Sequence, residues 1–230
     1  MKSILKLFLF LILFSCTNEN EIVSNSHQLI PVTNSIDSNI VKIIYPYKIS
    51  LEKEMNKVIS YSSNDLTKGQ PESKLGNFVC DLSLKYADGK ANICVFNNGG
   101  LRDVILKGNI TVKDIFQVMP FENELVIIEL NNKEYYTLLE YLTQRGGEPV
   151  GGVTITKRKD TIISNYNNYE KVKILTSDYL ANGGDNMDFF IGKEQKKLGV
   201  KLRDVIIEHC IQTDTIKVNL DNRLIIKDEE

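Results

Sequence analysis

Residues 178–190 read DYLANGGDNMDFF and contain three kinds of residue that could act on one ligand. Tyr179 offers a flat aromatic face, and Asp185 offers a carboxylate that accepts hydrogen bonds from hydroxyl groups. Between them, Gly183 and Gly184 leave the backbone bare, which lets a ligand approach it closely. A helix end followed by a loop has the same composition, so the segment alone does not decide between a binding site and a turn.

Two earlier segments have a similar polar and glycine-rich or aromatic character. FNNGGLRDVILKG (96–108) follows a short apolar strand pattern, and loops that leave strand ends are common ligand sites. It contains Asn97 and Arg102, whose planar guanidinium suits phosphate or sugar oxygens. MPFENEL (119–125) places Phe121 directly after a proline. Taken singly, the first segment also fits an ordinary turn, and Phe121 in the second also fits a core phenylalanine.

The histidine content argues against a metal-dependent catalyst in this chain. A zinc or dinuclear hydrolase site needs several His and Asp ligands that converge on the metal, and the sequence has two histidines. His27 lies in a polar stretch, and His209 lies in an apolar helical pattern where packing is its expected role. The sequence also has no G-x-S-x-G motif and no Walker loop. We therefore expect no catalytic residue, no metal ligand and no cofactor site here.

The N-terminus has the order of a secretory signal. MKSILKLFLFLILFSC begins with lysines, continues through an apolar block too short to span a bilayer, and ends at Cys16. The sequence L-F-S-C resembles the cleavage region of a bacterial lipoprotein signal, after which the cysteine is lipidated. We predict a signal peptide over 1–15, lipidation of Cys16 and a polar tether over 16–44. An ordinary signal peptide with a chance cysteine is the alternative.

Composition and charge limit the class of protein that the remainder of the chain can be. Residues 1–15 contain two lysines and no acidic residue, so their removal leaves 26 basic against 30 acidic residues, a net charge of −4. That balance does not predict a surface for a nucleic acid polymer. Residues 45–230 fit one domain. Its cysteines, Cys80, Cys94 and Cys210, are widely spaced, and we expect buried thiols, with one disulfide as the alternative.

Helices and strands alternate through this domain. Apolar spacing predicts helices over 48–59, 73–89, 111–119 and 200–212, and strands over 91–97, 153–163, 169–177 and 223–228. Residues 124–147 read as a strand, an Asn131–Asn132 turn and a helix. Ser73 is a plausible N-cap, Gly89 a helix stop, and Lys159–Asp160 a turn. The mixture, with hairpins, predicts an α+β fold: a layered α/β domain with a mixed sheet.

The polar segments, taken in order, resemble the C-terminal domain of the 5′-nucleotidase family. The matching motifs are N-G-G-x-R (98–102), P-F-x-N-x-L (120–125) and D-Y-L-A-N-G-G-D (178–185), and KLGNFVCD (74–81) resembles the family's L-G-N-hydrophobic run. The resemblance extends over residues 45–227 and implies a 5′-nucleotidase C-terminal domain-like fold. In that family a separate N-terminal metallophosphoesterase domain carries the metals and the catalytic residues, and the C-terminal domain binds the nucleotide.

The resemblance implies roles for the residues of the opening segment. Phe121 and Tyr179 would stack on the two faces of the base. Tyrosine in place of the more usual phenylalanine is tolerable, since stacking needs only a flat face and the hydroxyl can point to water. Asp185 would accept hydrogen bonds from the ribose hydroxyls, and Gly183 and Gly184 would keep side chains out of the path of the sugar.

The resemblance also implies roles for the first loop. Asn97 would bind the base edge or the ribose, and Arg102 the ribose and phosphate side. One departure concerns phosphate: the family usually has a further arginine shortly before the L-G-N run. This sequence has Lys68 and Lys74 in that stretch, and a lysine gives a point charge without a bidentate grip.

These roles predict the substrate-binding half of a split 5′-nucleotidase-like phosphohydrolase that is inactive alone. A separately encoded metallophosphoesterase would supply the divalent metals. The alternative is a stand-alone nucleoside- or nucleotide-binding lipoprotein without catalysis; a third reading is an interaction domain that has lost its ligand. The lipid would anchor the protein to the outer membrane facing the periplasm, because Thr17 rather than aspartate follows Cys16.

Overall fold

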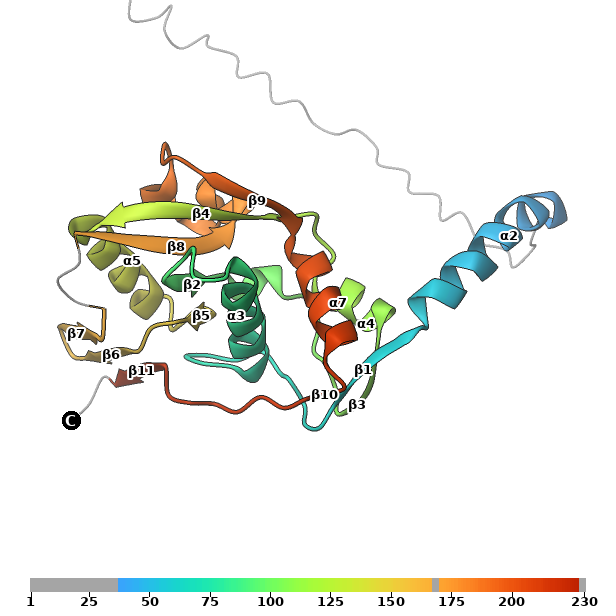
Figure 1. Ribbon diagram of the computed structural model, residues 1–230, viewed down its shortest axis with the longest axis horizontal. Helices are drawn as coiled ribbons and strands as arrows, with labels where there is room; N and C mark the ends of the chain where they lie inside the picture. Colours follow the sequence, from blue (N-terminus) through green and yellow to red (C-terminus); the bar gives the residue numbers. More distant parts are fainter. Residues whose placement is uncertain (1–36, 167–169, 228–230) are drawn as a thin grey trace, which may run out of the picture. The chain divides into compact units, whose positions relative to one another are not determined.

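A mixed five-stranded sheet organises the protein, whose computed structural model describes residues 37–166 and 170–227 (Figure 1). Its strands are β2 (Ile93–Val95), β4 (Glu124–Asn131), β5 (Val150–Gly151), β8 (Lys171–Ser177) and β9 (Lys196–Lys201). They lie in the order β5-β2-β8-β4-β9, with β2 and β8 parallel and the other neighbours antiparallel. The predicted α+β fold with a mixed sheet is confirmed.

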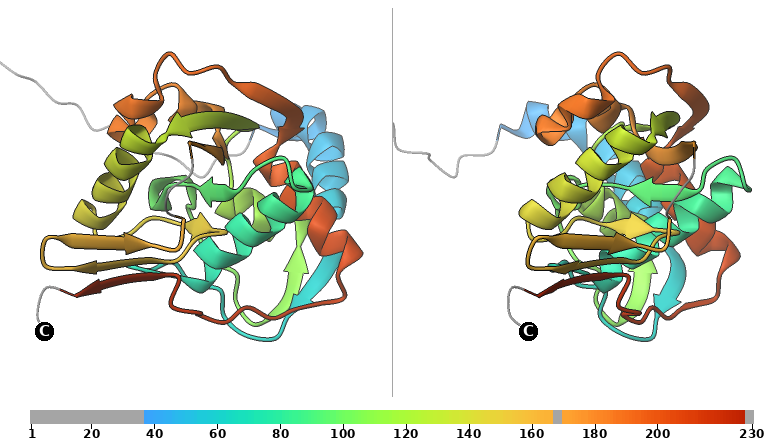
Figure 2. Two further views of the ribbon diagram at one scale, coloured as in Figure 1. Left: turned by 60° about the vertical axis from the view of Figure 1, so that its left-hand side comes forward. Right: turned by 90° about the vertical axis from the view of Figure 1, so that its left-hand side faces the viewer.

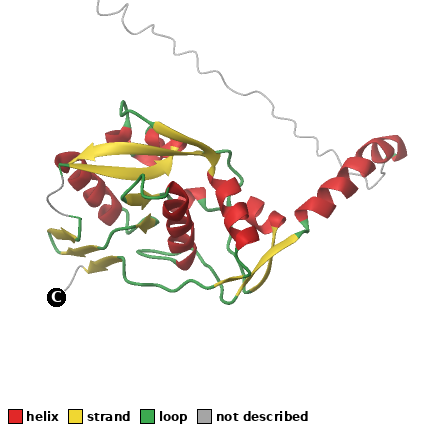
Figure 3. Ribbon diagram, viewed as in Figure 1, coloured by secondary structure: helices red, strands yellow, loops and turns green. Residues whose placement is uncertain are grey.

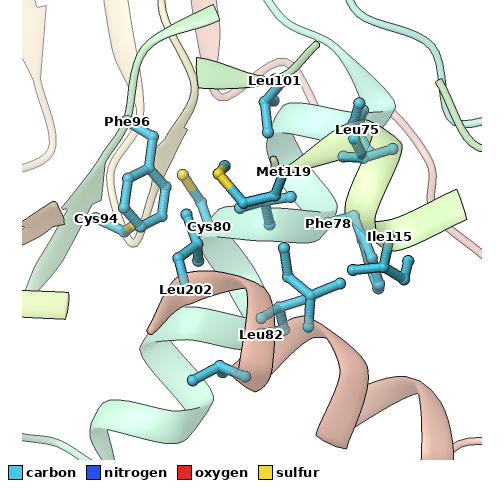
Figure 4. Close-up of a cluster of buried hydrophobic side chains, with 14 of the residues drawn as sticks. Leu75, Phe78, Cys80, Leu82, Cys94, Phe96, Leu101, Ile115, Met119 and Leu202 are labelled. Atoms are coloured by element: carbon cyan, nitrogen blue, oxygen red, sulfur yellow. The ribbon is translucent and has the colours of Figure 1, made fainter. Parts of the chain in front are cut away.

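Separate apolar cores cover the two faces of this sheet. The helices are α3 (Lys74–Ala87), α4 (Val112–Val118), α5 (Asn132–Gln144), α6 (Asp178–Ala181) and α7 (Leu202–Gln212). Alternate side chains of a strand point to opposite faces, so Leu125 and Ile127 join one core while Val126 and Ile128 join the other. The first core is completed by α3, α4 and α7 (Figure 4), and the second by α5 and α6. Burial on both faces therefore fixes the ends of β2, β4 and β8.

Two smaller sheets join distant parts of the chain. One contains β1 (Val58–Ser62), β3 (Gly108–Thr111) and β10 (Thr215–Ile216), and the other contains β6 (Ile155–Arg158), β7 (Thr161–Ser164) and β11 (Leu224–Lys227). Figure 2 shows β11, in dark red, beside the β6–β7 hairpin. The predicted turn between β6 and β7 is confirmed, and Lys159 has the left-handed φ of 51° that such a turn uses.

Several predicted helix ends are confirmed at the level of single atoms. The Ser73 hydroxyl accepts a hydrogen bond from the backbone N–H of Gly76 at 3.0 Å, as an N-cap does. At the other end of α3, Asp88 takes the left-handed conformation directly before Gly89. The Asn131–Asn132 turn is wrong: Asn131 is itself the N-cap of α5, so β4 continues directly into the helix.

The N-terminal boundaries differ from the prediction. Helix α2 (Ser38–Met55) begins inside the predicted tether and ends before Val58, where β1 starts, so the predicted helix over 48–59 is wrong at its end (Figure 3). None of the side chains of α2 is buried. The described residues from Ile44 onward form one compact unit. The predicted signal peptide, Cys16 and His27 lie outside the described residues.

The cysteines and His209 have the packing roles predicted for them. Cys80, Cys94 and Cys210 are buried and free. Burial raises the pKa of the Cys94 thiol and raises that of Cys210 to about 12. His209 is half-buried, and its ring lies 5.7 Å from the ring of Phe78 in an edge-on contact. Burial followed by the charge of Lys85 lowers the pKa of His209, so it is neutral at physiological pH.

Candidate functional site

One pocket of about 270 Å³ collects the polar segments that the sequence singled out. It is lined by Asn97, Gly99, Gly100, Arg102, Phe121, Asn123, Tyr179 and Asp185. The first four follow β2, the next two precede β4, and the last two follow β8. Because β2 runs parallel to β8 and antiparallel β4 neighbours β8, the ends of these strands meet at one sheet edge. Sheet topology therefore assembles the pocket from three distant stretches of chain.

Residues 178–185, here called the tyrosine segment, leave β8 through a short capped helix. The hydroxyl of Ser177 accepts a hydrogen bond from the N–H of Leu180 at 3.2 Å, which starts α6. This start leaves the Tyr179 side chain on the surface, where 46% of it is exposed. The ring then lies against the bare Cα of Gly184: a Cβ added there would be 2.5 Å from ring carbons of Tyr179.

The glycines of the tyrosine segment serve the protein's own packing. Gly183 has a φ of 90°, and a Cβ on it would lie 2.8 Å from the side chain of Ile191. Neither Gly183 nor Gly184 is among the residues that line the pocket. The glycines that do line it are Gly99 and Gly100, which precede Arg102.

Asp185 is held by hydrogen bonds at its carboxylate and at its backbone. One carboxylate oxygen accepts from the Tyr179 hydroxyl at 2.9 Å and the other accepts from the Asn97 amide at 2.6 Å. Its carbonyl oxygen accepts from the Tyr141 hydroxyl at 2.7 Å. The expectation that the hydroxyl of Tyr179 points to water is therefore wrong. Its hydrogen bond to Asp185 raises the pKa of Tyr179, so the hydroxyl stays protonated near neutral pH.

Residues 119–125, here called the phenylalanine segment, are held by charged groups. The guanidinium of Arg203, which is buried, donates to the carbonyl oxygen of Phe121 at 3.3 Å and pairs with Glu122. Lys201 also pairs with Glu122. These two cations lower the pKa of Glu122 to about 2, chiefly through the hydrogen bond from Arg203. Phe121 itself remains 40% exposed and faces the pocket.

Asp178 connects the two ring-bearing segments. One of its carboxylate oxygens accepts from the N–H of Glu124 at 3.1 Å and from the N–H of Tyr179 at 2.8 Å. Phe121 and Tyr179 both line the pocket, whereas Asp178 is not among its lining residues. Asp178 therefore fixes the starts of β4 and α6 relative to each other without occupying the space that the rings face.

Arg102 supplies the positive charge of the pocket lining. Its guanidinium donates to the carbonyl oxygen of Gly99 at 3.2 Å and lies 6.0 Å from the centre of the Phe121 ring. Among the described residues it makes no ion pair, so its charge is available to an anion. Lys68 donates to the carbonyl oxygen of Leu101 at 2.8 Å, next to this loop, but does not line the pocket; nor does Lys74.

Sequence reasoning missed several groups that shape the site. Asn123 lines the pocket, and the P-F-x-N spacing was the signal that could have identified it. Behind the first loop, the buried carboxylate of Glu148 accepts from the N–H of Asn98 at 2.6 Å and from Arg145 at 3.2 Å. No sequence signal links Glu148 to that loop, because 50 residues separate it from Asn98.

The described residues contain neither a candidate metal-ligand cluster nor a candidate membrane-spanning helix. No group of three or more His, Cys, Asp or Glu side chains in residues 37–166 and 170–227 is placed to hold a metal ion. Within the same residues, no helix has both the length and the apolar composition to cross a membrane. The pocket thus offers two aromatic faces, one carboxylate, one guanidinium and two amides, which are groups that bind and orient a ligand.

Comparison with known proteins identifies the class of this domain. Residues 53–191 match the profile of the family described as 5′-nucleotidase, C-terminal domain. The match covers more than half of the chain, so the chain belongs to this family. The solved structure of the 5′-nucleotidase precursor from Thermus thermophilus has the same fold, with a TM-score of 0.70 at 21% sequence identity. The predicted 5′-nucleotidase C-terminal domain-like fold is confirmed.

The relatives are considerably longer than the matched region. The 5′-nucleotidase of Vibrio cholerae is 28% identical over 135 residues, which cover 56% of this chain and 24% of the relative. The trifunctional nucleotide phosphoesterase of Bacillus subtilis is 38% identical over 103 residues, or 41% of this chain and 7% of the relative. The structural match covers 82% of this chain and 43% of the Thermus protein. The similarity thus concerns a part of each relative.

Proposed function

We propose that the pocket binds the nucleoside portion of a nucleotide. The base lies between Phe121 and Tyr179, the ribose hydroxyls bond to Asp185, and Arg102 lies on the phosphate side. Asn97 bonds to the base edge or the ribose. The observation that carries this proposal is that one pocket is lined by two aromatic faces, a carboxylate and a guanidinium from three segments of the chain.

The chemistry of these groups fits a nucleoside better than a purely apolar or a purely anionic ligand. Aromatic side chains stack on any base, because each base has a flat π-face, and each such contact is worth ~1–3 kcal/mol. A carboxylate accepts hydrogen bonds from sugar hydroxyls, and a guanidinium matches phosphate oxygens. At about 270 Å³ the pocket lies near the small end of ligand sites, which run from ~300 Å³ upward.

We further propose that this domain is the substrate-binding half of a split 5′-nucleotidase-like phosphohydrolase in nucleotide breakdown. A separately encoded metallophosphoesterase supplies the divalent metals and the catalytic groups, and this chain alone is inactive. Family membership supports the proposal, as does a pocket lining made of groups that bind and orient a ligand.

Calorimetric titration with AMP, adenosine and UMP tests the binding step. We predict that Phe121→Ala and Tyr179→Ala each weaken affinity by roughly tenfold to a hundredfold, because each removes one stacking face. Tyr136→Ala is the matched control: Tyr136 is equally exposed but lies on α5 and does not line the pocket. Unchanged affinity in both pocket variants would refute the site.

Nucleotide hydrolysis tests the split-enzyme step. The full chain is mixed with a separately encoded metallophosphoesterase from the same organism and with Mn²⁺ or Zn²⁺. We expect hydrolysis of AMP to be faster in the mixture than with the phosphoesterase alone, and Tyr179→Ala to remove the gain. A mixture no faster than the phosphoesterase alone contradicts the split enzyme while leaving the binding site intact.

A second candidate function is a stand-alone nucleoside-binding lipoprotein. The observation that favours it is the pocket charge: among the lining residues Arg102 is the one cationic side chain, which gives a phosphate a single charged partner. This reading expects tight binding of adenosine, little gain from phosphate, and no phosphoesterase recovered in pull-downs with the full chain.

We also propose that Cys16 is lipidated and that the lipid holds the domain at the outer membrane, facing the periplasm. The L-F-S-C sequence at the end of the apolar N-terminal block supports this. Metabolic labelling with an alkynyl fatty acid should label the wild-type chain and not Cys16→Ser, and membrane fractionation should place the label in the outer membrane. Labelling of both chains, or of neither, contradicts the proposal.

A further inference from the structure

Asp185 is held by more hydrogen bonds than it would need in order to accept one from a ligand hydroxyl. Its two carboxylate oxygens accept from Tyr179 and Asn97, its carbonyl oxygen accepts from Tyr141, and its N–H donates to the Tyr179 hydroxyl at 3.3 Å. Its φ is 53°, a conformation that a non-glycine residue keeps only where its surroundings impose it. The carboxylate is therefore fixed in direction before any ligand arrives.

The partners that fix the carboxylate are themselves held. The Tyr179 ring lies on the bare Cα of Gly184, where a Cβ would approach to 2.5 Å. The Asn97 side chain lies against Gly100, where a Cβ would approach its amide oxygen to 2.7 Å. Each donor therefore has glycine backbone directly against one side, which limits its movement in that direction.

The remaining acceptor capacity matches a pair of hydroxyls. A carboxylate has about four lone-pair positions, and within the described residues Asp185 uses one on each oxygen. One acceptor position is thus left on each oxygen, and the two oxygens belong to one rigid, planar group. Two hydroxyls on neighbouring carbons, as in the cis-diol of a ribose, can bond to such a pair at once, whereas a deoxyribose offers one.

We propose that the hydroxyl of Tyr179 is a positioning group that fixes Asp185 for a vicinal diol and thereby makes the pocket select ribonucleosides over deoxyribonucleosides. This inference rests on the proposed nucleoside site and deepens it. The ring of Tyr179 stacks on the base, and its hydroxyl has a second, separate task. A phenylalanine at this position stacks equally well but leaves one oxygen of Asp185 and the backbone N–H of Asp185 without their partner.

The Tyr179 hydroxyl acts as a hydrogen-bond donor, which supports separate roles for the ring and the hydroxyl. The hydrogen bond to the carboxylate raises the pKa of the phenol, so the proton stays on the tyrosine and Asp185 remains the acceptor. A hydrogen bond to a charged group is stronger than one between neutral groups. Loss of the hydroxyl leaves the carboxylate held by Asn97 alone, and the cost falls on ligands that use both oxygens.

The test compares adenosine, 2′-deoxyadenosine and 3′-deoxyadenosine by calorimetry on the full chain. We expect the wild type to prefer adenosine by about tenfold over either deoxy form, because each lacks one hydrogen bond to a charged group. In Tyr179→Phe the affinity for both deoxy forms stays within about twofold, and the preference for adenosine falls to about twofold. Asp185→Asn, which keeps the shape of the side chain, should lower the same preference.

Tyr136→Phe is the control for loss of a phenol, because Tyr136 is exposed on α5 outside the pocket; it should keep the wild-type preference. The inference is overturned if Tyr179→Phe keeps that preference, or if it weakens all three ligands equally. A wild type that binds adenosine and both deoxy forms equally also overturns it while leaving the nucleoside site standing. A wild type that binds none of the three refutes the proposed function itself.

Discussion

Tyr179 and Phe121 face the same pocket, yet the groups that hold the two rings differ in kind. The Tyr179 ring is held by contacts within its own segment: it lies on Gly184 and its hydroxyl donates to Asp185, whose carboxylate is held in turn by Asn97. The phenylalanine segment is held from outside, by Arg203 on α7 and Lys201 at the end of β9. One ring depends on steric fit and hydrogen bonds to a single carboxylate, and the other on ion pairs between distant elements.

The difference matters for how each side responds to change. Steric fit is insensitive to salt and to acid, whereas exposed ion pairs are screened by salt and lost when a carboxylate is protonated. The tyrosine segment should therefore fail when its local geometry is altered and the phenylalanine segment when its charges are removed. Asp178 bonds to the N–H of Glu124 and to that of Tyr179. A change in one segment should therefore also shift the ring of the other.

The largest effect is expected from Gly184→Ala. The new Cβ would lie 2.5 Å from carbons of the Tyr179 ring, so the ring must leave its place and Asp185 loses its donor. Overpacking of this kind costs ~1–3 kcal/mol, which we expect to appear as a roughly tenfold to hundredfold loss of adenosine affinity in calorimetry. Gly69→Ala, whose Cβ would meet only ordinary contacts, is the control. Wild-type adenosine affinity in Gly184→Ala would contradict the claim that steric fit holds the Tyr179 ring.

A smaller effect is expected from Arg203→Met, which keeps the apolar stem and removes the charge. The carbonyl oxygens of Met119 and Phe121 lose a donor, and Glu122 loses its main partner. Charge-assisted hydrogen bonds contribute ~1.5–3 kcal/mol each, so we expect the unfolding free energy to fall by about 2 kcal/mol in urea titrations. Adenosine affinity should fall less than in Gly184→Ala. A larger fall would mean that the ion pairs of the phenylalanine segment matter more for binding than the steric fit of Tyr179.

The same contrast explains what the sequence could predict. The three motifs were recognisable because each follows or precedes an apolar strand, and strands buried on both faces are visible as apolar runs. β9 was missed because its sequence, KKLGVK, carries lysines at the sheet edge and has no apolar run. The lysine that ends it, Lys201, is nevertheless one of the two cations that hold Glu122.

Contacts across long separations were beyond prediction. Glu148 supports the N–H of Asn98 across 50 residues, and Arg203 reaches the carbonyl oxygen of Phe121 across 82. The hydroxyl of Tyr179 was a different case, because only six residues separate it from Asp185. The chain between them turns through residues in the left-handed region, Gly183 with a φ of 90° and Asp185 with a φ of 53°. Sequence spacing alone does not give that turn.

The smallest effect concerns acid. The hydrogen bonds and charges of Arg203 and Lys201 lower the pKa of Glu122 from its ordinary 4.5 to about 2. Its folded-state pKa is depressed, so its stabilising contribution is complete above pH 4.5 and is lost as the pH falls toward 2. We expect Glu122→Gln to be less stable than the wild type at pH 7 and the difference to shrink below pH 4.5. Urea titrations of both proteins at pH 7, 5 and 3.5 measure this difference.

Glu194→Gln, at an exposed carboxylate outside the phenylalanine segment, is the control. A difference that stays constant across this range would show that the charge of Glu122 does not hold the phenylalanine segment.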